Sequence, residues 1–324
     1  MTVEVLKPGL ATSVQDLGRP GHFHLGIPEG GAMDRLALIA ANLLVGNDES
    51  AAGLECPFMG PALAFERDAR VAVTGADLPV LIDGQEQPCW TALRVRAGQV
   101  LSFGILRGGA RAYIAIDGGI ATAPVLGSRS TYFVGGFGGF QGRVLAAGDR
   151  LPLGPASTTR HADRNVPPAL RRRPGNPAEL RVLPGLYWHR ITAAAGRQFF
   201  ASEWKVASES DRMGYRFTGG KAIEFVEREP PFGAGSDPSN IVDSPYPYGS
   251  VQIPSGLEPI VLHRDAVSVG GYFQIGTVIF ADLDLIGQMP PNLPARFVSV
   301  DLAQALAARA DLTALLHRLR ATLV

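Results

Sequence analysis

Glycine and proline divide this chain into many short apolar segments. The 324 residues include 39 glycines and 25 prolines, and the stretches between them are rich in valine, isoleucine, leucine and aromatic residues. Short runs bounded by turn residues are typical of β-strands. The expected strands are residues 2–6, 62–65, 71–74, 79–82, 93–95, 100–103 and 111–116, followed by residues 180–183, 204–207, 222–226, 250–253, 260–263, 273–280 and 296–300. We therefore predict a mainly β protein.

Two segments have helical periodicity instead. Residues 33–45 place Leu36, Ile39 and Leu43 on one face and end before Gly46, a residue that commonly terminates helices. Residues 301–322 begin with an aspartate and carry leucines at helical spacing, so this helix is expected to pack against a sheet.

The strands fall into two sets. Between them, residues 156–178 contain almost no large apolar side chain and include three consecutive arginines. This composition predicts a linker or surface excursion with a solvated charge run. The expected domains are a first β lobe at residues 1–155 and a second β-rich lobe with the terminal helix at residues 179–324.

The charge balance excludes several classes of partner. Lys plus Arg and Asp plus Glu number 30 each, so no field of one sign attracts nucleic acid or an anionic membrane. No apolar run approaches the roughly 20 residues of a membrane-spanning helix, and the first residues do not resemble a secretion signal. Cys56 and Cys89 stand outside any CxxC pair, and we interpret both as buried small residues. We expect a cytoplasmic protein that binds neither nucleic acid nor membrane.

The sequence lacks the motifs of the common nucleotide-binding and hydrolase sites, including GxxxxGK[ST], GxSxG and HExxH. It does contain an opening loop, residues 18–35, in which glycines and two prolines fix the backbone. His22 and His24 in this loop could hold a metal, but no carboxylate cluster accompanies them. We predict no metal site and interpret both as hydrogen-bonding residues, with proton transfer by one of them as the alternative.

Residues 127–143, GSRSTYFVGGFGGFQGR, combine hydroxyls, an arginine and a glycine-rich run. Arg129, Ser130 and Thr131 could hold a carboxylate or phosphate together with backbone N–H groups. A hairpin loop whose hydroxyls satisfy their own backbone is an equally good interpretation.

A second polar group lies in residues 208–217, SESDRMGYRF. Arg212 beside Asp211 and Tyr215 offers a planar fork suited to a carboxylate, although internal Arg–Asp pairing is the favoured interpretation from these residues alone. Gln252 carries an amide that could match a ureido or lactam group, or it is simply a strand-edge residue.

These motifs resemble a known family. The stretches VQDLGRPGHFHLGIPEGGAMDRLALIAANLLVGN, AYIAIDGGI, LGSRST, GGFQGRVLAAGD, SDRMGYRF and GSVQIPSGLEPIVLHRD are similar in content and order to the biotin-dependent carboxyltransferase family. This family includes the C-type subunit of 5-oxoprolinase, the allophanate hydrolase subunit 2 type and the antagonist of the sporulation kinase inhibitor. The resemblance extends from about residue 3 to residue 297.

The resemblance implies two cyclophilin-like β-barrel lobes with few helices. It also implies a hetero-oligomeric hydrolase in which this chain, inactive alone, works with two partners, a kinase-inhibitor-type (B-type) protein and an A-type protein. That complex opens 5-oxo-L-proline to L-glutamate and uses ATP.

The resemblance also gives the polar residues roles. The opening loop would line a cleft at the mouth of the first barrel. Ligand-binding residues would be Arg129, Ser130, Thr131, Arg212 and Tyr215 for an anion, and Gln252 for an amide. The candidates for the catalytic base are Asp34, Asp211 and His24, with Asp265 as a further option.

Two departures from the family pattern stand out. Ala266, Val267 and Ser268 replace the Gln-Thr-Thr-type stretch that usually precedes the last Gly-Gly-Tyr, and no Met-Lys-Met motif is present. Biotin is therefore not expected to be attached to this chain.

Two alternative functions follow from the family. One is a carboxyltransferase component that acts on urea or a similar amide with carboxybiotin from a separate carrier. The other is a non-enzymatic binding module that sequesters a kinase-inhibitor-type partner.

Overall fold

The structure is a computed structural model that describes residues 2–156, 164–229 and 231–323. The chain forms two compact units. The first comprises Met1–Arg19, Gly30–Arg173 and Ala314–Val324, and the second comprises Pro20–Glu29 and Pro174–Thr313. The main boundary, after Arg173, lies within the segment expected as a linker. The opening-loop residues Pro20–Glu29 group with the second half of the chain.

The first unit contains two antiparallel β-sheets. One has the strand order β11-β1-β4-β9-β6-β7 and the other β2-β3-β10-β5-β8. The strands are β1 Thr2–Lys7, β2 Ser13–Gln15, β3 Gly53–Pro57, β4 Ala62–Phe65, β5 Ala69–Asp77, β6 Val80–Ile82, β7 Gln85–Gln87, β8 Ala92–Val95, β9 Val100–Phe103, β10 Gly108–Ile116 and β11 Arg150–Pro152. Apolar side chains of both sheets, such as Val3, Leu63, Val73 and Ile114, form one core.

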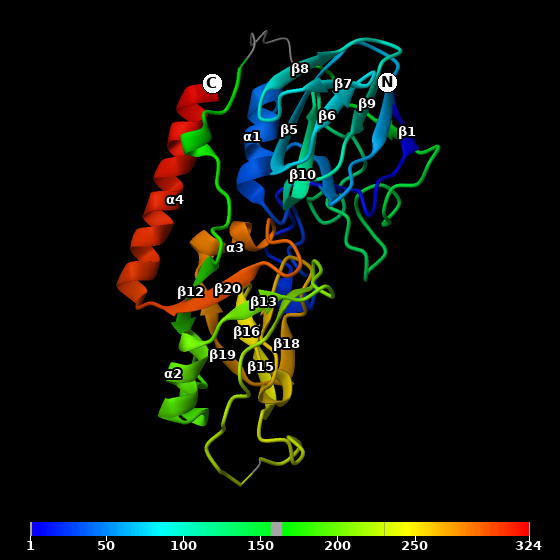
Figure 1. Ribbon diagram of the computed structural model, residues 1–324. Helices are drawn as coiled ribbons and strands as arrows, with labels where there is room; N and C mark the ends of the chain where they lie inside the picture. The colour runs from blue at the N-terminus through cyan, green and yellow to red at the C-terminus, as the bar shows by residue number, and fades with distance from the viewer. Residues whose placement is uncertain (1, 157–163, 230, 324) are drawn as a thin grey trace. The chain divides into compact units, whose positions relative to one another are not determined.

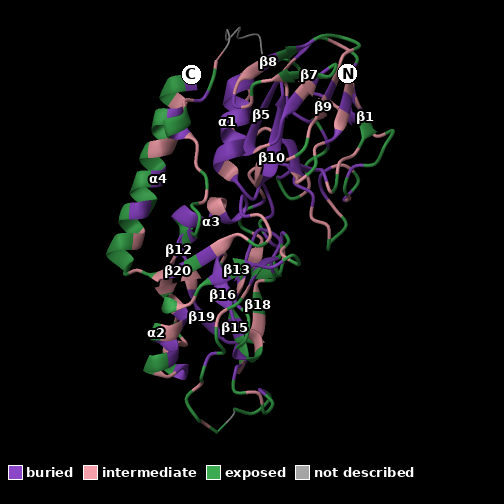
Figure 2. Cartoon of the chain, viewed as in Figure 1, coloured by how far each residue is buried: buried purple, intermediate pink, exposed green. Residues whose placement is uncertain are grey.

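Helix α1, Arg35–Val45, packs on β5 and β10 of the five-stranded sheet (Figure 1). It ends at Gly46, which adopts a φ of 79° that favours glycine. The sequence pattern predicted one apolar face, but every residue after Arg35 is buried, and Figure 2 shows the helix as almost wholly purple. The polar Asn42 is accommodated because its amide donates to the carbonyl of Ala51 at 2.8 Å.

The second unit is built on a closed barrel with the strand order β12-β19-β16-β17-β14-β13-β20. Its strands are β12 Ala178–Pro184, β13 Trp204–Val206, β14 Gly214–Thr218, β16 Ser250–Gln252, β17 Ile260–Leu262, β19 Gln274–Val278 and β20 Pro294–Ser299. The barrel closes where β20 pairs in parallel with β12, whereas the other neighbours are antiparallel. A separate ribbon pairs β15, Asn240–Pro245, with β18, Val269–Tyr272.

The second unit also contains the helices α2 Ala193–Ala201 and α3 Phe280–Ile286, and α4 Leu302–Leu323 begins in this unit and ends in the first. Helix α2 packs on β20, where the ring of Phe199 stacks on Phe297 with the ring centres 4.8 Å apart. Helix α4 is largely green along its length in Figure 2, so most of its side chains are exposed. No helix in the described part of the chain combines the length and the apolar character that crossing a membrane requires.

The expected mainly β architecture is confirmed, and the second unit is a closed barrel. Most expected strands are confirmed within one to three residues. The strand expected at residues 222–226 is wrong, because this segment forms only an isolated bridge between Ile191 and Phe225. The strand expected at residues 273–280 ends at Val278, and Phe280 begins α3.

Part of the segment expected as a linker packs against the first unit. Residues 157–163 of that segment lie outside the described residues. Val166 is buried, and the guanidinium of Arg171 lies 5.5 Å from the ring centre of Trp90 while donating to the carbonyl of Val166. The expectation of a fully solvated arginine run is therefore wrong for Arg171, whose pKa is lowered mainly by burial.

Candidate functional site

The hydroxyl groups of the GSRST segment surround a buried carboxylate in the first unit. Asp16 follows β2 and accepts hydrogen bonds from the hydroxyls of Ser128 and Ser130, both at 2.6 Å. It also accepts from the backbone N–H of Gly18 at 2.8 Å and of Arg129 at 2.5 Å. These donors are thus used inside the protein, and Asp16 fixes the loop shape.

The two neighbouring candidates have backbone partners. Arg129 donates through Nε to the carbonyl of Thr122 at 2.7 Å, and Thr131 donates through its hydroxyl to the carbonyl of Val14 at 3.0 Å. Both acceptors lie outside the GSRST segment. The hydroxyl of Ser128, however, accepts from the backbone N–H of Ser130 at 2.9 Å, as the hairpin alternative expected. Ligand binding by Arg129, Ser130 and Thr131 stays a prediction.

Asp34 stabilises the start of α1. Its carboxylate accepts from the N–H of Ala37 at 3.0 Å, as an N-cap does. Its own backbone N–H donates to the hydroxyl of Tyr113, which in turn donates to Glu55 at 2.8 Å. Burial, and then the charge of Glu55, raise the pKa of Tyr113 well above its usual value. Asp34 therefore belongs to a buried network that orients the helix.

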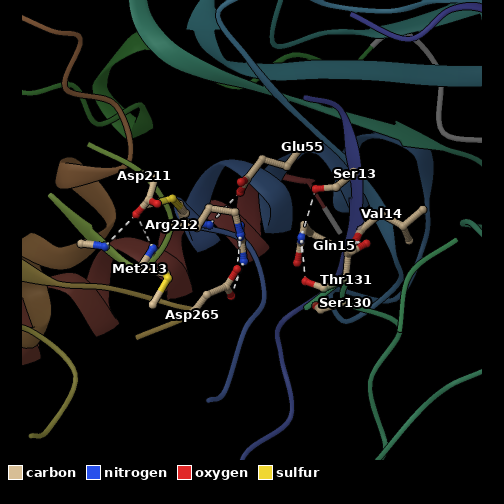
Figure 3. A network of polar contacts seen from close by, with 12 residues as sticks. Ser13, Val14, Gln15, Glu55, Ser130, Thr131, Asp211, Arg212, Met213 and Asp265 are labelled. Atoms are coloured by element: carbon tan, nitrogen blue, oxygen red, sulfur yellow. Dashed lines mark hydrogen bonds and ion pairs between the residues drawn. The ribbon is translucent and has the colours of Figure 1, made fainter. Parts of the chain in front are cut away.

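In the second unit, the SDRMGYRF segment forms a tight turn and a buried ion pair (Figure 3). Asp211 accepts from the backbone N–H of Met213 at 2.8 Å and of Gly214 at 3.0 Å. Arg212 makes a two-point contact with Asp265, with Nε to Oδ2 at 2.8 Å and Nη2 to Oδ1 at 3.0 Å. Internal Arg–Asp pairing, favoured by the residues alone, is what the structure contains.

Tyr215 and Gln252 lie on two barrel strands, β14 and β16, that are separated by β17. Tyr215 is fully buried in β14, with its ring centre 6.1 Å from that of His263. Gln252 is buried in β16, near the hydroxyl of Tyr246. Burial raises the pKa of Tyr246, although the hydrogen bond between its hydroxyl and the carbonyl of Tyr272 lowers it. Gln252 is therefore one contact removed from a pocket that Tyr246 lines.

That pocket is lined only by residues of the second unit. It has a volume of about 220 Å³, which is smaller than the roughly 300–1,000 Å³ typical of sites for drug-sized ligands. Its lining comes from the opening loop, the turn after β15 and the turn after β17, with the residues Phe23, Glu29, Tyr246, Pro247, Tyr248, Leu262, His263, Arg264 and Ala266. A small metabolite matches this size.

The opening loop contributes to this pocket in the second unit. Phe23–Leu25 form a short 3-10 helix, and Phe23 lines the pocket. His24, one of the predicted proton-transfer residues, follows Phe23 and is exposed. His22 is half-buried beside them.

The turn after β17 supplies the polar wall of the pocket. The N–H of His263 donates to the carbonyl of Met213, and the N–H of Asp265 donates to the carbonyl of Arg212. Together with the Arg212–Asp265 ion pair, these bonds hold the turn against the 211–213 loop. His263 and Arg264 are thereby held in buried positions at the pocket.

Arg264 is the buried cation of the pocket. Its side chain is 2% exposed, and its Nη1 and Nη2 atoms lie 3.5 Å from Glu29 and 3.8 Å from Asp284. Its guanidinium carbon lies 4.4 Å from the ring centre of Tyr248, a cation–π distance. The pocket therefore presents a positive group next to aromatic walls.

His263 lines the same pocket and donates a hydrogen bond inside the protein. Its Nε2 lies 3.0 Å from the carbonyl oxygen of Leu283 and 3.3 Å from the hydroxyl of Tyr248. A carbonyl oxygen only accepts, so Nε2 must carry a proton. The pocket can bind an anion at Arg264, and the phenol of Tyr248 can donate a hydrogen bond to an amide carbonyl.

The sequence interpretation missed most of these pocket residues. Glu29, His263 and Arg264 lie within the stretches that carry the family resemblance, and Tyr246 and Tyr248 lie just before one of them, but none was predicted as a site residue. A usable signal was present, since a His-Arg-Asp triplet directly follows an apolar strand in IVLHRD. Among the described residues, no group of three or more His, Cys, Asp or Glu side chains is arranged to hold a metal.

Comparison with known proteins places this chain in a family. The family model described as the carboxyltransferase domain, subdomain A and B, matches residues 25–299. The chain is 38% identical over 311 residues to the C-type subunit of 5-oxoprolinase from Escherichia coli (strain K12), with 95% of this chain and 94% of that protein covered. It is 33% identical over 303 residues to the protein of the same name from Haemophilus influenzae, covering 94% and 93%.

A solved structure is also similar to this chain along most of its length. The crystal structure of K. lactis urea amidolyase matches 97% of this chain with a TM-score of 0.89 and 31% identity, although the match spans only 20% of that chain. Because both the family model and the relatives cover most of the sequence, the chain belongs to the family of the carboxyltransferase domain, subdomain A and B.

Proposed function

We propose that this chain is the C-type subunit of a 5-oxoprolinase, which opens the lactam of 5-oxo-L-proline to L-glutamate with hydrolysis of ATP. The observation that carries the proposal is the nearly end-to-end likeness to two proteins named as that subunit of 5-oxoprolinase. By contrast, the chain corresponds to only a fifth of urea amidolyase, a much longer protein.

The pocket in the second unit supports a small anionic substrate. Its volume of about 220 Å³ and its buried Arg264 suit a compact acid better than a nucleotide. We therefore assign ATP binding to the partner proteins. The three lysines, Lys7, Lys205 and Lys221, lie outside any Met-Lys-Met motif, in agreement with a chain to which no biotin is attached.

The lactam carbonyl must be polarised for its amide bond to open. Donors aimed at the developing oxyanion are the usual means of doing so. The phenol of Tyr248 is such a donor at this pocket, whereas the Nε2–H of His263 is directed to the carbonyl of Leu283. Among the predicted bases, Asp34 and Asp211 already accept backbone N–H groups. We therefore favour His24, which is exposed beside Phe23.

We propose two partners in the cytoplasm, a kinase-inhibitor-type (B-type) protein and an A-type protein. The test is to purify the three chains separately, mix them and measure L-glutamate and ADP formed from 5-oxo-L-proline and ATP. We expect coupled release only when this chain is present. Turnover by the two partners alone, or no turnover by the full mixture, would contradict the proposal.

A second candidate is carboxyl transfer from a separate carboxybiotin carrier to urea or a similar amide. It is favoured by the family description and by the high structural similarity to urea amidolyase. Loss of label from a carboxylated biotin carrier that depends on urea and on this chain would support it. Stable partner binding without either reaction would instead indicate a binding module that sequesters the kinase-inhibitor-type protein.

A further inference from the structure

Arg264 is buried but poorly paired. Charge-assisted N–H···O contacts are normally about 2.7–2.9 Å long, whereas Arg264 approaches its two carboxylates only to 3.5 and 3.8 Å. Other arginines of this unit show what close pairing looks like. Arg212 contacts Asp265 at 2.8 and 3.0 Å, and Arg181 contacts Asp282 at 2.7 and 2.9 Å.

The Arg264 donors are also not used up by hydrogen bonds. Among the described residues, no acceptor satisfies the buried Nε of Arg264, and an unsatisfied buried donor is unfavourable. The flat face of the Arg264 guanidinium packs on the ring of Tyr248. Its N–H groups point along the plane, where a carboxylate can accept two of them side by side.

Glu29 is the carboxylate that a ligand can displace from Arg264. Its side chain is 47% exposed, in contrast to 2% for Arg264, so it can turn into solvent at little cost. Asp284 is held more firmly, with 13% of its side chain exposed. The remaining charged group next to the turn, Asp265, is already paired with Arg212. Arg264 therefore has two long carboxylate contacts, and only the one to Glu29 involves a largely exposed side chain.

We propose that Arg264 binds the carboxylate of a small acidic ligand in this pocket, and that Glu29 stands in for that carboxylate while the pocket is empty. The ligand displaces Glu29 and gains the short two-point contact that Glu29 does not make. The class of ligand is a small carboxylic acid. Its identity as 5-oxo-L-proline rests on the proposed function, but the role of Arg264 does not.

The test is binding of two matched probes, 5-oxo-L-proline and 2-pyrrolidone, which is the same lactam ring without the carboxylate. Titration calorimetry with the full chain, alone and mixed with its partners, should detect the acid and not the neutral lactam. R264Q should weaken binding of the acid at least tenfold. R264K, which keeps the charge but loses the planar fork, should bind the acid with an affinity between those of the unchanged protein and R264Q.

Glu29 gives the sharper test because its removal should improve binding. E29Q should tighten binding of the acid about two- to fivefold, as expected for loss of a weak competing ion pair. The matched control is E203Q, since Glu203 pairs with Arg296 on an exposed surface and should have no effect. In the double variant E29Q/R264Q the gain should vanish, and thermal melting of each variant checks folding.

Each outcome decides the proposal. Equal binding of the two probes, unchanged affinity in folded R264Q, or no gain in E29Q would overturn it. Absence of carboxylate binding to the chain in any mixture would also overturn it. If L-proline or L-glutamate binds in an Arg264-dependent way but 5-oxo-L-proline does not, the role of Arg264 stands and the proposed 5-oxoprolinase function fails.

Discussion

Removing the carboxylate of Asp265 should destabilise the second unit far more than removing a surface carboxylate of nearly the same geometry. Arg212 and Asp265 form a two-point ion pair at 2.8 and 3.0 Å with side chains only 11% and 3% exposed. Arg107 and Glu86 form a similar pair at 2.8 and 3.2 Å with side chains 57% and 52% exposed. The two pairs differ mainly in burial.

Burial decides the magnitude because an unpaired buried charge cannot be solvated. Breaking a buried pair costs about 3–5 kcal/mol, so D265N should lower the free energy of unfolding by about that amount. E86Q should leave it nearly unchanged, because water screens an exposed pair. The double variant R212M/D265L should be more stable than D265N, since it removes both charges of this buried pair.

The assay is urea unfolding followed by tryptophan fluorescence and circular dichroism, with the free energy of unfolding obtained by linear extrapolation. If D265N lowers the free energy of unfolding no more than E86Q does, the Arg212–Asp265 pair does not hold the turn after β17 and the reasoning is wrong. If the double variant is as unstable as D265N, loss of the buried counter-charge is not the cause of the lost stability.

Four further predictions follow from the contacts described above or from nearby backbone geometry. D34A should destabilise the first unit by about 0.5–2 kcal/mol in urea unfolding, because α1 loses its N-cap; a change within error would contradict the capping role. G139A should be more damaging to the melting temperature than G136A, because both glycines have positive φ but an added Cβ would overlap the side chain of Thr131 only at position 139; equal effects would refute this. The pKa of Asp149 is lowered, first by its hydrogen bond from Arg143, so its contribution to stability is present above the unfolded pKa and is lost as pH falls. In urea unfolding between pH 3 and 7, the free energy of unfolding of D149N should therefore fall less steeply below about pH 4 than that of the unchanged protein. Cys56 should resist thiol reagents in the native protein, because its side chain is buried and burial raises its pKa, and mass spectrometry of labelled peptides would show any early modification.

Much of the fold could be predicted because turn residues mark the ends of its strands. The strands at residues 62–65 and 100–103 match β4 and β9 at both ends. The sequence was misleading where an apolar run has no sheet partner, as at residues 222–226, and where one run continues from β19 into α3. Helix α2 was missed because the alanines of Ala193–Ala201 carry little periodicity, although Thr192 is a good N-cap.

The candidate site was harder to predict because its contacts are long-range. Asp16 binds the hydroxyl of Ser130, which is 114 positions away in the chain, and no local pattern reveals that the GSRST donors are already used. The same is true of Arg264 and Glu29, which are 235 positions apart. The sequence gives the chemical groups, but burial and pairing decide which of them are available to a ligand.

The closure of the barrel has a consequence for shortened forms of the protein. Strand β20 lies between β12 and β13, pairing with both, although it is the last barrel strand in the chain. A stop codon after Val300 keeps all seven barrel strands, whereas one after Leu293 removes β20, the strand that closes the barrel. The second product would expose two bare strand edges, and such edges promote aggregation between chains.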